Sequence, residues 1–186
     1  MERISERVSV ERSKDLITVV ISARLPRAKE GLLMAWVLMW TACGAVFIHQ
    51  FATLPNGSMR AFMLGMSAVW LFYELRIGRT LLWRMKGFEF WRVKDGVLTI
   101  KDSIFGYGKA RDWFVTNIRD LGVLAMDRSD WRMQFTDSFW TMAGERLGFS
   151  HLEKRVAFGK GLTDDEATAL VRILKDRFAQ ERKAAQ

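Results

Sequence analysis

The sequence is poor in the residues that cross-link a chain or ligate metal ions. Its 186 residues include one cysteine, Cys43, which has no partner for an intrachain disulfide. It has two histidines, His49 and His151, and neither belongs to a spacing that binds a metal ion. No G-x-S-x-G sequence is present. We therefore expect no disulfide framework, no metal, no cofactor and no catalytic residues, and so no enzyme.

Charge is scarce in a long central segment. Between positions 31 and 83 the charged residues are only Arg60, Glu74, Arg76 and Arg79. The run Gly31–Phe51 has no charged side chain in 21 residues, and a membrane-spanning helix needs about 20 apolar residues. A chain of this size rarely buries every side of so long a helix. We therefore predict that this run crosses a lipid bilayer.

A second apolar run follows a turn signal at residues 55–57, Pro-Asn-Gly. It covers Ala61–Trp83, but its uncharged part, Ala61–Tyr73, is too short to span a bilayer alone. If the helix continues past Glu74, the long arginine side chains that follow can reach the lipid headgroups. The two runs thus predict an antiparallel transmembrane hairpin over residues 31–83.

The formal net charge of +8 is concentrated beside this hairpin. The loop between the two runs carries only Arg60, whereas the opposite flanks carry seven basic residues: Arg24, Arg27, Lys29, Arg76, Arg79, Arg84 and Lys86. Basic residues collect on the cytoplasmic side of membrane spans. We therefore predict a multi-pass protein of the cell (inner) membrane with both termini in the cytoplasm. Elsewhere basic and acidic residues alternate, as in ERISERVSVERSKD, so we expect no nucleic-acid partner.

The remaining chain has a β pattern and predicts a cytoplasmic domain over residues 84–186. FEFWRVKDGVLTIKDSIF alternates apolar and polar residues around Asp95-Gly96, which is typical of a hairpin. Further strands are predicted in KARDWFVTNIRDLGVLAMD, DWRMQFTD and RLGFSHLEKRVAFGKGL. Within the N-terminal segment 1–30, the β-branched stretch Asp15–Leu25 predicts a strand that joins the same sheet.

The C-terminal segment predicts a helix over residues 163–182. Thr163 and Glu166 have the spacing of a capping box, and apolar residues follow at helical spacing. The preceding FGKGLT lacks the glycine spacing of a phosphate-binding loop, so we interpret it as a turn and helix cap. The apolar face of this helix would cover the open end of a small barrel.

This order of elements resembles bacterial membrane proteins that carry a pleckstrin-homology-like domain. The resemblance is carried by LLWRMKGFEFWRVKDGVLTI, FGYGKARDWFVTNIRDLGV and RLGFSHLEKRVAFGKGLTDDEATALVRIL, and it covers nearly the whole chain. It implies a small antiparallel β-barrel capped by the last helix, and a role in binding or assembly rather than a reaction. We therefore expect an α+β fold: a two-helix transmembrane hairpin plus a PH-like barrel capped by a C-terminal helix.

The expected function is that of a scaffold, assembly factor or accessory subunit of a larger membrane protein complex. Its expected partners are membrane lipid and other integral membrane subunits, with no small-molecule substrate. Contact with anionic lipid or a partner is expected at seven residues: Arg76, Arg79, Arg84, Lys86, Lys109, Arg111 and Trp113.

Glu74 carries the alternative hypothesis. As the one acidic residue in the two apolar runs, it could serve a membrane enzyme or an ion-conducting element together with the interfacial arginines. We prefer to interpret it as an interfacial carboxylate paired with Arg27 or Lys29.

Overall fold

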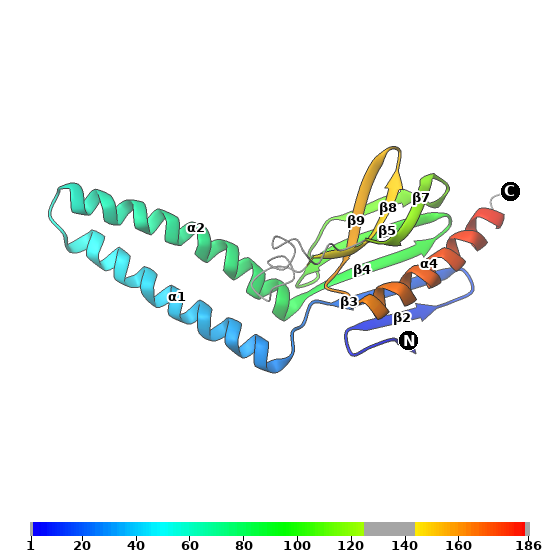
Figure 1. The fold of residues 1–186 in the computed structure, drawn as a ribbon, viewed down its shortest axis with the longest axis horizontal. Coiled ribbons are helices and arrows are strands. Elements are labelled where there is room, and N and C mark those ends of the chain that lie inside the picture. The colour runs from blue at the N-terminus through cyan, green and yellow to red at the C-terminus, as the bar shows by residue number, and fades with distance from the viewer. Residues whose placement is uncertain (1, 125–143, 185–186) are drawn as a thin grey trace.

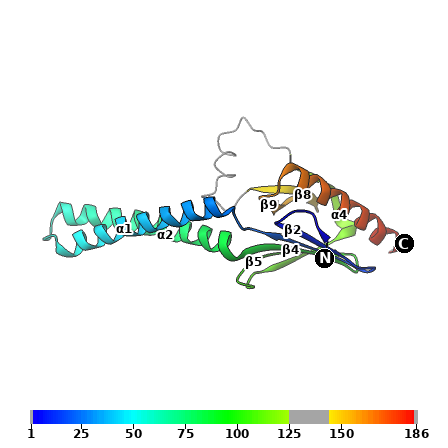
Figure 2. The same cartoon turned by 90° about the horizontal axis from the view of Figure 1, so that it is seen from below.

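The structure is a computed structural model that describes residues 2–124 and 144–184. Two long helices project from a β-rich region, and Figures 1 and 2 show them lying side by side from the loop at their tip to the sheets. We call the two helices the helical arm. They are α1, Arg27–Thr53, and α2, Ser58–Lys86.

The helical arm is held together by small residues and polar contacts. The indole ring of Trp70 on α2 packs against Gly44 of α1, and its Nε1 donates a hydrogen bond to the carbonyl oxygen of Trp40 at 2.9 Å. At the tip, Arg60 donates to Asn56 Oδ1 at 2.6 Å and lies over the ring of Phe51. Glycine lets the two helix backbones approach closely because it has no side chain.

The larger sheet has six antiparallel strands in the order β1-β2-β3-β4-β5-β6. Its strands are β1 Glu2–Arg3, β2 Val8–Arg12, β3 Leu16–Ser22, β4 Gly87–Lys94, β5 Val97–Ile104 and β6 Ala110–Phe114. β3 precedes the helical arm and β4 follows it, yet the two strands pair from Leu16↔Lys94 to Ser22↔Phe88. The arm is therefore an insertion between two neighbouring strands of one sheet.

The smaller sheet has three antiparallel strands in the order β7-β8-β9. The 3-10 turn η1, Val115–Asn117, separates β6 from β7, Ile118–Val123. β8 is Glu145–His151, β9 is Lys154–Lys160, and the last helix is α4, Asp164–Ala184. The two sheets and α4 share one apolar core, in which the Trp91 ring meets that of Phe158 at 4.8 Å and Leu170 and Leu174 are fully buried.

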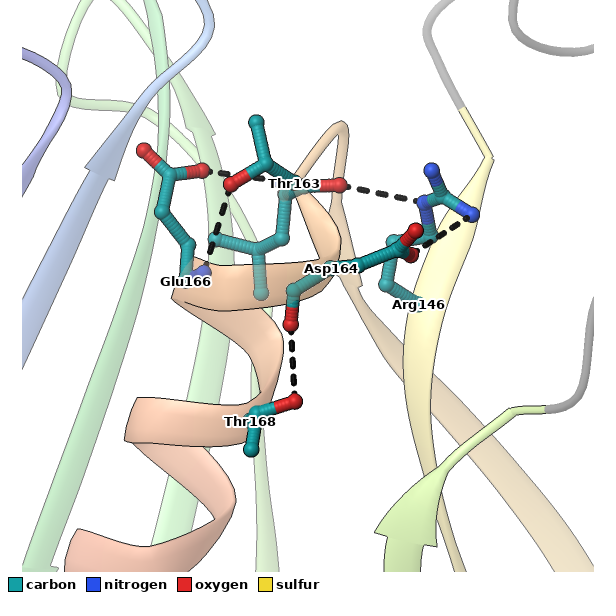
Figure 3. A network of polar contacts seen from close by, with 6 residues as sticks. Arg146, Thr163, Asp164, Glu166 and Thr168 are labelled. Atoms are coloured by element: carbon teal, nitrogen blue, oxygen red, sulfur yellow. Dashed lines mark hydrogen bonds and ion pairs between the residues drawn. The ribbon is translucent and has the colours of Figure 1, made fainter.

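Several local predictions are confirmed. The Asp95-Gly96 turn joins β4 to β5, and both residues have positive φ, 50° and 73°, which a tight hairpin turn requires. The predicted strand 15–25 contains β3, which joins the sheet. The capping box is present (Figure 3): the backbone N–H of Thr163 donates to Glu166 Oε2 at 2.9 Å, and that of Glu166 donates to Thr163 Oγ1 at 3.2 Å.

The predicted fold class, a transmembrane hairpin plus a capped barrel, is wrong. The strands of the described residues form two separate sheets of six and three strands that do not close into a barrel. The chain leaves the larger sheet at η1, and two backbone N–H groups of β9, at Gly159 and Lys160, are bound by the side chain of Glu89 instead of by a neighbouring strand. A side chain thus takes the place of the strand pairing that closure would need.

The hairpin half of that prediction is wrong as well. Of the three α-helices in the described ranges, α1 is the one that is long and apolar enough to cross a membrane. Glu74, Arg76 and Arg79 make the second half of α2 too polar for the same test, so a multi-pass arrangement is not supported.

Two other differences concern the β region. Strands β1 and β2 were not predicted, because glutamate and arginine interrupt the apolar residues there; Val8 and Val10 of β2 are fully buried. The predicted strand in DWRMQFTD, residues 130–137, lies outside the described residues.

Candidate functional site

A cavity of about 620 Å³ lies where the helical arm meets the two sheets. We call it the junction cavity. α2 forms one wall, β4 to β6 form a second and β8 and β9 a third. Its charged and aromatic lining residues are Arg79, Trp83, Glu89, Asp102, Tyr107, Lys109, Arg111, Trp113, Glu145, Phe158 and Lys160.

Strand register explains why charged side chains meet on one wall. Glu89 of β4 pairs directly with Asp102 of β5, and Ile100 of β5 pairs with Arg111 of β6. Side chains two apart on a strand share a face of the sheet. Glu89 therefore points to the same side as the buried Trp91, toward the smaller sheet.

Glu89 is a buried carboxylate that joins the two sheets. It is 1% exposed, and its oxygens accept hydrogen bonds from Trp91 Nε1 at 2.8 Å and from the backbone N–H groups of Gly159 at 2.9 Å and Lys160 at 2.8 Å. Burial raises the pKa of Glu89, and these three donors oppose that rise. Its oxygens are already hydrogen-bonded within the protein, and these bonds hold β9 against β4.

Asp102 and Lys160 form an ion pair across the cavity, between β5 and β9. The Lys160 ammonium also lies 5.3 Å from the centre of the Trp83 ring, within the range of a cation–π contact. Lys160 is thus held by both a carboxylate and an aromatic ring, and its charge is largely compensated within the protein.

Glu145, at the start of β8, is in a different position. Burial raises its pKa, Lys160 and Arg111 lower it, and Asp102 raises it. Unlike Glu89 and Asp102, it has no hydrogen bond or ion pair to another described residue. Its carboxylate is therefore the one in the cavity lining that is available to a ligand.

Three cations of the lining are similarly available. Arg79 of α2, Lys109 of the β5–β6 connection and Arg111 of β6 are exposed. Within residues 2–124 and 144–184, none of the three forms an ion pair. They come from three different segments, so only the folded protein brings them to one cavity.

The structure gathers four of the seven predicted contact residues. Arg79, Lys109, Arg111 and Trp113 line the junction cavity, whereas Arg76, Arg84 and Lys86 do not. Arg84 is buried at 4% exposure, and Arg76 and Lys86 are exposed elsewhere on α2.

The acidic half of the lining was missed by the sequence analysis. Glu89, Asp102 and Glu145 come from three strands, β4, β5 and β8. One signal was present: in FEFWRV, Glu89 alternates in step with Trp91 and Val93, which places a carboxylate on the apolar face of its strand.

Other candidate residues are placed apart from this cavity. Glu74 accepts a hydrogen bond from Thr41 Oγ1 at 2.8 Å, across the helical arm, so the preferred pairing with Arg27 or Lys29 is wrong. Cys43 is exposed on α1. No cluster of three or more histidine, cysteine, aspartate or glutamate residues suited to a metal ion occurs in the part of the chain that the structure describes.

Comparisons with protein-family models, with curated proteins and with solved structures found no match for this chain. The resemblance to membrane proteins with a pleckstrin-homology-like domain therefore stays a prediction.

Proposed function

We propose that this protein is a membrane-attached scaffold or accessory subunit without enzymatic activity. The observation that carries this proposal is the apolar surface of the helical arm. Only 11% of the most apolar stretch of α1 is buried, whereas the core helix of a water-soluble domain is mostly buried. Large apolar side chains are exposed along both helices, including Leu32, Leu38, Val46, Phe62, Val69, Phe72 and Leu75. An apolar surface of this extent suits lipid rather than water.

The pairing of β3 with β4 supports a proposal for the topology. Because these strands flank the helical arm and pair along seven residues, both ends of the arm lie on the same side of any membrane it enters. Basic residues gather at that end of the arm, and Arg60 alone lies near the tip. This distribution supports the cell (inner) membrane, with both termini in the cytoplasm.

The partners we propose are lipid and other integral membrane subunits. Among the described residues, β6 is an edge strand of the larger sheet, and Phe114 at its end is 63% exposed. An exposed edge offers unpaired backbone groups to a strand from another chain. This edge supports a scaffold or assembly role in a larger complex.

An enzymatic or ion-conducting role for Glu74 is the alternative function. Thr41 donates to one oxygen of Glu74, and the other oxygen is buried without a partner among the described residues. The hydrogen bond from Thr41 on α1 satisfies the first oxygen, so that oxygen needs no bound ion. We therefore favour the scaffold and test Glu74 separately below.

Membrane attachment is tested by fractionation. Cells that produce the full chain are lysed without detergent, and the membranes are washed at high salt and alkaline pH. We expect the protein to remain in the pellet until detergent is added. Recovery in the supernatant would overturn the proposal.

A matched pair of substitutions sharpens this test. Leu38 on α1 and Leu152 on the β8–β9 turn are almost equally exposed, 68% and 70%. Leu38→Arg should move protein to the soluble or aggregated fraction, because an arginine in the hydrocarbon costs about 3 kcal/mol. Leu152→Arg should leave the distribution unchanged.

The scaffold role is tested by purification in mild detergent, where we expect other membrane proteins to be recovered with the chain. If only the single chain is recovered, the scaffold role is overturned, even when the chain is membrane-attached.

A further inference from the structure

The junction cavity offers a ligand charges of both signs. Two of its three carboxylates are already used: Glu89 accepts three hydrogen bonds and Asp102 pairs with Lys160. What remains available is one carboxylate, Glu145, and three cations from α2 and the β5–β6 region: Arg79, Lys109 and Arg111.

We propose that the junction cavity binds a phosphoethanolamine group, in which a phosphate diester is linked to a primary ammonium. Arg79, Lys109 and Arg111 bind the phosphate oxygens, since arginine and lysine are the usual partners of phosphate. Glu145 accepts hydrogen bonds from the ammonium. The source is phosphatidylethanolamine of the surrounding membrane, so this inference rests on the membrane attachment proposed above.

Ligands of a single charge sign fit this lining less well. A purely anionic headgroup would gain from the three cations but would bring no hydrogen-bond donor to the Glu145 carboxylate. A metal cation would be repelled by Arg79, Lys109 and Arg111. A choline headgroup has the same net charge as ethanolamine, but its trimethylated nitrogen has no N–H to donate to Glu145.

The position of the cavity favours a lipid as the source. Arg79 and Trp83 belong to α2 itself, so one wall continues directly into the helical arm. Arg79 lies 19 residues after Arg60 on this helix, about 28 Å along the axis. The hydrocarbon core of a bilayer is about 30 Å thick. The cavity therefore lies at the sheet end of the arm, about one hydrocarbon thickness along α2 from its tip.

Binding is measured on the full chain in mild detergent, where membrane attachment has no influence. The water-soluble probes are glycerophosphoethanolamine, glycerophosphoglycerol and glycerophosphocholine, each titrated by calorimetry. We expect glycerophosphoethanolamine to bind at least about tenfold more tightly than the other two, because one charge-assisted hydrogen bond contributes on that order. Equal affinities, or tighter binding of glycerophosphoglycerol, would overturn the inference.

A second arm identifies the source. The chain is placed in lipid nanodiscs that contain phosphatidylethanolamine, phosphatidylglycerol and phosphatidylcholine in equal amounts, and the lipids that stay bound after detergent extraction are identified by mass spectrometry. Retained phosphatidylethanolamine supports the membrane as the source. If glycerophosphoethanolamine binds but no phosphatidylethanolamine is retained, the membrane source is overturned and a free phosphoethanolamine compound takes its place.

Variants assign the two ends of the ligand. Arg111→Gln and Lys109→Gln should weaken binding of glycerophosphoethanolamine about tenfold or more, whereas Arg92→Gln, on the opposite face of the same sheet, should not. Glu145→Gln should remove the preference for ethanolamine over glycerol, and Glu11→Gln, exposed on β2, should preserve it. Unchanged binding in both Arg111→Gln and Lys109→Gln would overturn the phosphate assignment.

The two proposals fail in different ways. A chain that binds glycerophosphoethanolamine in detergent but fractionates as a soluble protein would contradict the membrane attachment and leave the ligand class in place. A chain that stays in the membrane but shows no ethanolamine preference would contradict the ligand class alone. Thermal unfolding of each variant confirms that a loss of binding is not a loss of fold.

Discussion

Trp70 and Gly44 interlock at the centre of the helical arm. A Cβ atom at position 44 would lie 1.8 Å from Cε2 of the Trp70 ring, which leaves no room for any side chain other than hydrogen. The same ring is fixed by its hydrogen bond to the carbonyl of Trp40. This contact joins α1 to α2 and keeps the arm a closely packed pair.

We therefore predict that Gly44→Ala destabilises the arm. Overpacking of a tight contact costs about 1–3 kcal/mol, and here the ring must also give up its hydrogen bond. The measurement is the thermal unfolding temperature of the full chain in mild detergent. Gly65→Ala is the control, since nothing lies within 4 Å of a Cβ built at position 65. Equal unfolding temperatures for the two variants would show that Trp70 moves aside at little cost.

The hydrogen bond from Thr41 to Glu74 gives a second prediction. Thr41→Val removes the donor and should lower stability in detergent by about 1 kcal/mol, while Glu74→Gln retains an acceptor and should change stability by less. If the scaffold function is correct, cells or proteoliposomes with Glu74→Gln show no change in ion flux. A loss of flux with insertion intact would favour the ion-conducting alternative.

Glu89 makes stability depend on pH in a defined direction. Burial raises its pKa above the ordinary 4.5, so the folded protein holds this proton more tightly than the unfolded chain does. The stabilisation from this group is therefore complete below about pH 4.5 and is lost as the pH rises through the folded-state pKa.

This dependence is measured as the difference in unfolding free energy between the unsubstituted protein and Glu89→Gln. The difference, taken as the former minus the latter, should fall with increasing pH above 4.5. The exposed Glu11→Gln variant corrects for effects of charge substitution in general. A difference that increases with pH would contradict the predicted direction.

The capping box of α4 predicts that substitutions of its two residues have non-additive effects on stability. Thr163→Ala and Glu166→Ala should each destabilise the protein by about 1 kcal/mol. Each removes the side-chain oxygen that accepts a hydrogen bond from one backbone N–H group at the start of the helix. The double variant should lose less than the sum. Thr168→Ala, whose hydroxyl only bonds the Asp164 carbonyl, should cost less than about 0.5 kcal/mol. Denaturant titration followed by circular dichroism measures all four variants.

The elements that the sequence predicted depend on short-range chemistry. The Asp95-Gly96 turn, the Thr163 cap and the β-branched strand before the arm each follow from residues within a few positions of one another. The site was harder to predict, because its parts are far apart in sequence. Glu89 accepts a hydrogen bond from the backbone N–H of Lys160, which is 71 residues away, and no local pattern predicts that contact.

By itself, then, the amino-acid order determined where the apolar helices, the tight turns and most strands lie, since hydrophobic period and capping act over one or two turns of chain. Only the tertiary structure decided that the strands form two open sheets and that Glu145 shares a cavity with Arg79. Sheet order and the burial of Glu89 depend on contacts between distant segments, and those are selected by the packing of the whole core.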